Sequence, residues 1–177
     1  MKRLNGIKYY NFSLFILVLV LTACNQRPHF ELYEGKPLKI AVIGESPKVK
    51  EEQVRFEEIT FDEILNKEIG SYDAVFITEE NLIEADESQY ADVYLNSTIP
   101  FFFISTKSHI PFSLKDTEYD HNWNWAAGSN FAVGMLTSQE NGKLKSWGYG
   151  LYNDEKTDEN IKDVYSRIFK TIDGLNL

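Results

Sequence analysis

The stretch from 38 to 44, Leu38-Lys39-Ile40-Ala41-Val42-Ile43-Gly44, is apolar except for Lys39 and ends in glycine. Such a run is typical of a strand that is buried on both faces, because both alternating sets of its side chains are apolar. Residues 72–78 and 99–105 repeat this composition, and Pro100 stands at the start of the latter, where a missing backbone donor is tolerated. The three runs predict the central strands of one sheet.

The segments between these runs predict an edge strand and two helices. Residues 54–60 alternate apolar and polar side chains, which indicates a more exposed strand near the edge of the sheet. Thr60 and Glu63 match a capping box that begins a helix, and Gly70 stands where a left-handed cap would end it. The apolar face of this helix is formed by Phe61, Ile64, Leu65 and Ile69. A second, weaker helical pattern covers residues 86–95.

The C-terminal half opens with a long segment without periodicity, residues 106–130. Residues 131–137 and 145–152 then flank Asn141-Gly142, which favours a hairpin turn, and we expect an antiparallel pair that extends the sheet. A helix over 125–139 is the alternative, because its two glycines weaken a helix without forbidding it.

The last element is an amphipathic helix that starts after Thr157 or Asp158 and ends near Gly174. Its apolar face is formed by Ile161, Val164, Tyr165, Ile168, Phe169 and Ile172. Strands that alternate with helices predict an α/β fold: a layered mixed sheet with flanking helices. We expect a flavodoxin-like or Rossmann-like alternation that ends in a hairpin and a C-terminal helix.

The N-terminus carries Lys2, Arg3 and Lys8, followed by an apolar run from Leu14 to Leu21. This order is typical of a signal peptide, and the run is too short to span a bilayer. The following Leu21-Thr22-Ala23-Cys24 resembles the lipobox of bacterial lipoprotein signal peptides. The resemblance implies cleavage before Cys24, attachment of diacylglycerol and a fatty acid such as palmitate to that residue, and a lipid-anchored, extracytoplasmic location on the cell membrane.

This organisation predicts three segments: a signal peptide over 1–23, a tether over 24–36 and a single α/β domain over 37–177. Cys24 is the only cysteine, so no disulfide is expected once it carries lipid. The formal net charge is −9, and it becomes −12 once Lys2, Arg3 and Lys8 are removed with the signal peptide. Polyanions repel such a surface, so we expect no nucleic-acid partner and no membrane contact other than the lipid.

No enzyme motif of established mechanism is present. The chain lacks the glycine-rich phosphate loop, the dinucleotide fingerprint and the Gly-x-Ser-x-Gly elbow, and we expect no cofactor. The strand layout resembles that of receiver domains of two-component systems, with Lys107 after the fourth strand. That family also implies paired acids after the first strand and an aspartate after the third, where this chain has Glu45 alone and Thr78-Glu79-Glu80.

Two functions remain open. The first is a non-enzymatic envelope module that binds a small ligand or a protein. The second is an envelope hydrolase or metal-dependent enzyme that uses the loop over 105–125. Ser105, His109 and Asp116 supply the residue types of a catalytic triad, and His109 and His121 supply metal ligands.

In a doubly wound sheet, ligands bind outside the carboxyl ends of the strands, where successive crossovers diverge to opposite faces. The polar residues after the predicted central strands and in the following loop are therefore the candidate binding residues. They are Glu45, Ser46, Glu79, Glu80, Ser105, Lys107, His109, Asp120 and Trp123. The hairpin aromatics Trp147 and Tyr149 are an alternative interaction surface, or they pack against the core.

Overall fold

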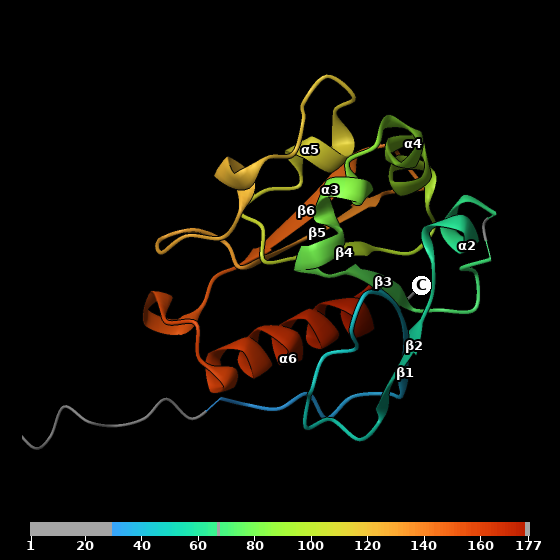
Figure 1. The fold of residues 1–177 in the computed structure, drawn as a ribbon. Helices are drawn as coiled ribbons and strands as arrows, with labels where there is room; N and C mark the ends of the chain where they lie inside the picture. Colours follow the sequence, from blue (N-terminus) through green and yellow to red (C-terminus); the bar gives the residue numbers. More distant parts are fainter. Residues whose placement is uncertain (1–29, 67, 176–177) are drawn as a thin grey trace, which may run out of the picture. The chain divides into compact units, whose positions relative to one another are not determined.

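In the computed structural model, which describes residues 30–66 and 68–175, six strands form one mixed sheet with the order β2-β1-β3-β4-β5-β6 (Figure 1). The strands are β1 (Leu38–Ile43), β2 (Val54–Glu58), β3 (Ala74–Ile77), β4 (Phe101–Ile104), β5 (Ala132–Thr137) and β6 (Leu144–Tyr149). The pairs β1–β2, β1–β3 and β3–β4 are parallel, whereas β5 runs antiparallel to β4 and β6. The predicted α/β fold, with the second strand at an edge, is confirmed.

Helices cover both faces of this sheet (Figure 1). They are α2 (Phe61–Leu65), α3 (Leu82–Ala85), α4 (Ser88–Asn96), α5 (Ile110–Ser113) and α6 (Asp158–Gly174), with short 3-10 turns η1 (Glu79–Asn81), η2 (His121–Trp123) and η3 (Tyr152–Asp154). One core cluster joins the sheet to α2–α5, and a second joins the opposite face to α6. This two-sided cover explains why β1, β3 and β4 are apolar on both faces.

Aromatic rings fill both layers of the core. Phe101, Phe102 and Phe103 are completely buried in β4. Phe103 stacks on Phe112 of α5 with ring centroids 3.9 Å apart, on one face of the sheet. On the other face, Phe76 lies parallel to Phe169 of α6 at 6.3 Å. The neighbouring strands β4 and β3 therefore pack against helices on opposite faces of the sheet.

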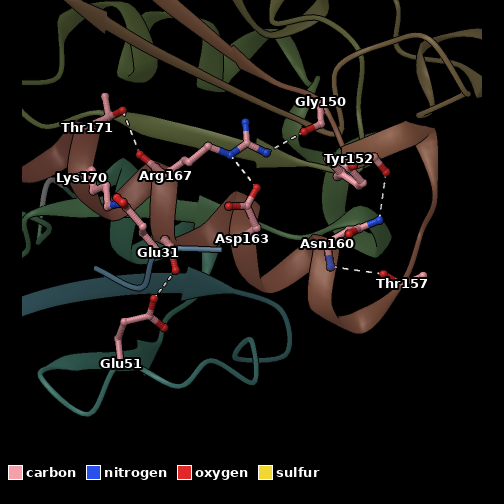
Figure 2. Close-up of polar contacts among 11 residues, drawn as sticks. Glu31, Glu51, Gly150, Tyr152, Thr157, Asn160, Asp163, Arg167, Lys170 and Thr171 are labelled. Carbon is pink, nitrogen blue, oxygen red and sulfur yellow. Dashed lines mark hydrogen bonds and ion pairs between the residues drawn. The ribbon is translucent and has the colours of Figure 1, made fainter. Parts of the chain in front are cut away.

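Helix α6 is held to its surroundings by polar contacts along its length (Figure 2). The hydroxyl of Thr157 accepts the N–H of Asn160, which confirms the predicted start of the helix. Farther along, Nε of Arg167 donates to Asp163 at 2.8 Å and Nη2 donates to the carbonyl of Gly150 at 2.7 Å. Arg167 thus ties the helix to the segment that follows β6.

One prediction about a glycine is wrong, whereas the predicted antiparallel pair in the C-terminal half is confirmed. Helix α2 begins with the predicted capping box between Thr60 and Glu63, but it ends at Leu65, and the backbone of Gly70 is not left-handed. The alternative helix over 125–139 is absent, because 132–137 form β5. Gly134 lies under the ring of Phe102, where any larger side chain would overlap that ring.

The folded unit begins at Glu31 and not at Pro37. Tyr33 is only 3% exposed, and its ring lies 6.0 Å from that of Phe169. Its carbonyl accepts a hydrogen bond from Nε2 of Gln53 at 2.6 Å, and its hydroxyl donates to the carbonyl of Lys36 at 2.8 Å. The predicted tether is therefore too long at its C-terminal end. The predicted signal peptide, Cys24 and residues 25–29 lie outside the described residues.

Candidate functional site

A cleft of about 480 Å³ opens at the carboxyl ends of β1, β3 and β4. The chain leaves β1 for β2 on one side and returns to β3 on the other, so the connecting loops diverge at this point. Five candidate residues from the sequence line this cleft: Glu45, Ser46, Glu79, Glu80 and Ser105.

The first wall of the cleft is the turn after β1. Gly44 has a φ of +113°, and any larger side chain there would overlap the hydroxyl of Thr78. That hydroxyl lies 2.6 Å from Oε1 of Glu80, which also accepts the backbone N–H of Glu45 at 3.4 Å. The hydrogen bond from Thr78 is the largest cause that lowers the pKa of Glu80 below its ordinary value. An ionised Glu80 therefore holds the turns after β1 and β3 together.

Ser46 is held from the opposite direction. Its backbone N–H and its hydroxyl both approach Oε1 of Glu58, the last residue of β2, at 3.3 Å. The edge strand thereby positions the turn after β1.

The floor of the cleft is formed around Ser105, which directly follows β4. Its φ of +67° is unusual for a serine, and the residue is only 2% exposed. Its backbone N–H donates to the carbonyl of Phe131 at 2.6 Å. Nζ of Lys156 lies 3.4 Å from the Ser105 hydroxyl and 3.2 Å from Oε2 of Glu79. This ammonium group therefore bridges the ends of β3 and β4.

The second wall comes from the first turns of α6. Asp158, Ile161, Lys162 and Tyr165 follow helical spacing and line the cleft together. Tyr165 is buried, and this burial, followed by the nearby charge of Glu80, raises the pKa of its hydroxyl. The sequence pattern indicated only the packing role of this helix, so these residues and Lys156 were missed. The acid and base one turn apart at 158 and 162 were the available signal.

Four candidate residues do not line the cleft: Lys107, His109, Asp120 and Trp123. The backbone N–H of Lys107 donates to the carbonyl of Trp123 at 3.0 Å, and its ammonium lies 5.8 Å from the indole centroid. Asp120 accepts the N–H of Asn122 at 2.9 Å and caps η2. His109 is half-buried at the start of α5. These contacts hold the loop after β4 to itself.

The sequence supplied Ser105, His109 and Asp116 as residue types of a catalytic triad, but the structure does not assemble them. The hydroxyl of Ser105 has Lys156 as its partner instead of His109. Within 30–66 and 68–175, no group of three or more histidine, cysteine, aspartate or glutamate side chains is placed to share a metal ion. In the same part of the chain, no helix is both long and apolar enough to cross a membrane.

The hairpin aromatics pack against the core. Tyr149 is 6% exposed and donates its hydroxyl to Thr171 at 2.8 Å. The indole of Trp147 stacks on Phe102 with ring centroids 6.3 Å apart. Both rings therefore cover the end of the α6 layer, and the cleft is the better candidate site.

Comparison with protein-family models, with curated proteins and with solved structures gives no match for this chain. The functional inference therefore rests on the cleft itself and on the N-terminal sequence.

Proposed function

We propose that this protein is an extracytoplasmic lipoprotein that is anchored in the cell membrane through lipid on Cys24. We propose further that it binds a small polar ligand in the cleft at the carboxyl ends of β1, β3 and β4, without catalysing a reaction. The observation that carries the proposal is the position of this cleft, at the point where the crossovers from β1 diverge, because open α/β sheets bind ligands there.

The order of the N-terminal sequence supports the anchor, because basic residues precede a short apolar run that ends in the lipobox at Cys24. The acidic chain is repelled by anionic headgroups, and lipid on Cys24 overcomes this repulsion because acyl chains bury their surface in the bilayer.

The polar floor of the cleft supports binding without catalysis. Glu79 pairs with Lys156, which presents an ammonium donor to the hydroxyl of Ser105. A nucleophilic serine needs a neighbouring base that takes its proton, and an ammonium group cannot do so. The same arrangement leaves the hydroxyl proton of Ser105 available to an acceptor atom of a ligand.

The anchor is tested by the variant Cys24→Ser in cells that are fed labelled palmitate. We expect the label to disappear from the protein, the uncut precursor to accumulate and the membrane-bound fraction to fall. Asn25→Ser is the matched control and retains all three properties. Unchanged labelling of the Cys24→Ser protein would contradict the lipid anchor.

The cleft is tested by thermal shift with probes of different charge: L-leucine, inorganic phosphate and glucose. We expect one of them to raise the melting temperature, and the double variant Glu79→Gln with Lys156→Met to abolish that shift. The control is Asp92→Asn with Lys115→Met, which removes an ion pair of 2.7 Å outside the cleft. If no probe stabilises the protein, the proposed binding function is wrong.

One observation favours hydrolysis as a second candidate. The left-handed backbone of Ser105 at the end of a central strand, with Lys156 at 3.4 Å, has the residue types of a serine-lysine catalytic pair. A fluorophosphonate probe distinguishes the two functions. We expect no labelling, because the neighbour of Ser105 is an ammonium group, which cannot take the proton of its hydroxyl. Labelling that disappears in Ser105→Ala would replace binding with hydrolysis.

A further inference from the structure

We infer that the ligand of the cleft is a small zwitterion, of the chemical class of free amino acids and short peptides. This inference rests on the proposed binding function and concerns the charge pattern of the same cleft. Seven charged side chains line the cleft. Three of them form ion pairs or hydrogen bonds with other groups of the protein, and four have no such side-chain partner in the described part of the chain.

Three of these charges are used within the protein. Glu79 and Lys156 neutralise each other at 3.2 Å. The carboxylate of Glu80 accepts hydrogen bonds from Thr78 and from the backbone of Glu45. The pair of Glu79 and Lys156 therefore needs no counter-charge from a ligand, and Oε1 of Glu80 already has its hydrogen bonds although its negative charge remains.

The other four charges have no side-chain partner among the residues that the structure describes: Glu45, Lys48, Asp158 and Lys162. Each wall of the cleft carries one of either sign. Glu45 and Lys48 belong to the loop after β1, and Asp158 and Lys162 belong to the first turns of α6.

This balance selects among ligand charges. A simple anion would meet two unpaired carboxylates, and a simple cation would meet two unpaired ammonium groups, so each gains attraction and repulsion together. A ligand that carries both charges offers an ammonium group to the acids and a carboxylate to the lysines. Opposite charges on both sides thus favour the zwitterion.

The space between the two walls fits such a ligand. The volume of the cleft, about 480 Å³, is within the usual range for small-molecule pockets. Beside the charged groups it has an apolar lining of Ile104, Phe131 and Ile161. An amino acid with an aliphatic side chain would bury that chain against these residues. Inorganic ions and sugars have no aliphatic part to bury.

The inference is tested by calorimetry on the full chain, purified in mild detergent, with L-leucine and two analogues. N-acetyl-leucine lacks the ammonium group and leucine amide lacks the carboxylate. We expect each analogue to bind about tenfold more weakly than leucine or worse, because a charge-assisted contact is lost.

Two double variants test which charged residues of the cleft contact the carboxylate of the ligand and which contact its ammonium group. Lys48→Met with Lys162→Met should weaken leucine and N-acetyl-leucine by about tenfold and leave leucine amide unchanged. Glu45→Gln with Asp158→Asn should weaken leucine and leucine amide and leave N-acetyl-leucine unchanged. The control, Lys115→Met with Lys143→Met, removes two lysines outside the cleft and changes none of the three. General damage to the fold would weaken every ligand alike.

Three results would overturn the inference. Leucine affinity that is unchanged in both cleft variants would place the zwitterion elsewhere. Binding of phosphate or glucose alone, lost when Glu79 and Lys156 are replaced, would keep the proposed binding function and reject the zwitterion. Absence of binding by every probe would reject the proposed function and this inference together.

Discussion

The backbone N–H of Tyr33 donates to Oε1 of Glu51 at 3.4 Å, which joins the start of the folded unit to the loop between β1 and β2. The hydroxyl of Ser166 in α6 donates to the same oxygen, and the backbone N–H of Lys50 donates to Oε2 at 3.1 Å. Glu51 is only 5% exposed. One buried carboxylate therefore links three segments, two of which carry walls of the cleft.

Deletion of residues 31–36 should destabilise the domain. The loss removes the buried ring of Tyr33 and one donor to Glu51. Tyr33→Ala in the intact chain should cost about 3 kcal/mol of unfolding free energy, as for other buried aromatic side chains. Leu32→Ala, at the neighbouring exposed residue, should cost about 0.5 kcal/mol or less. Urea denaturation measures both. Equal stability of chains that start at Glu31 and at Pro37 would contradict the packing of Tyr33.

Ser166→Ala should lower the unfolding free energy by about 1–3 kcal/mol, because it leaves the buried carboxylate of Glu51 without one of its donors. Ser146→Ala, at an exposed position of β6, is the matched control and should change stability by about 0.5 kcal/mol or less. Chemical denaturation of both variants gives the difference. A Ser166→Ala protein as stable as the control would show that this hydrogen bond contributes nothing.

Gly44→Ala should destabilise the domain and disturb the cleft. A Cβ atom at Gly44 would overlap the Thr78 hydroxyl, and its φ of +113° is unfavourable for alanine. Gly70→Ala provides the control, since nothing lies within 4 Å of an added Cβ there. We expect a lower melting temperature only for Gly44→Ala. Similar melting temperatures of the two variants would show that the turn after β1 adapts to a side chain.

The unfolding free energy of the domain should decrease as the pH decreases, in part because of His109. Burial lowers the pKa of His109 below its ordinary value of 6.5. The unfolded chain therefore takes up the proton first, so this contribution is fully present above about pH 6.5 and is lost as the pH falls toward the folded pKa. His109→Gln should reduce this loss in urea titrations between about pH 7.5 and 5.5. His121→Gln, at an exposed histidine, should retain it. An identical pH dependence of both variants would contradict the burial effect.

An element of the fold could be predicted from the sequence when the pattern that indicates it lies within a few neighbouring residues. The runs that became β1, β3 and β4 were recognisable because strand burial leaves a pattern within a few residues. The capping box at Thr60 is equally local. The true end of α2 was not predictable, because Ile69 is buried although it lies outside the helix, and its spacing looks helical. A single buried tyrosine at position 33 leaves no periodic pattern at all.

The same distinction applies to the cleft: some of its residues follow from local patterns, and others are placed there only by packing between distant residues. Glu45, Glu79 and Ser105 follow apolar runs that were recognisable locally as strands, and the chain order alone indicates that the ends of such parallel strands meet at one edge of a sheet. The sequence by itself therefore determined the layered α/β fold and half of the cleft. Only the tertiary structure decided that Lys156 and the start of α6 close it, because the direction in which a helix crosses a sheet depends on packing between distant residues. The left-handed backbone at Ser105 and the contacts that follow it keep Lys107 and His109 out of the cleft, and no pattern in the surrounding residues encodes that turn.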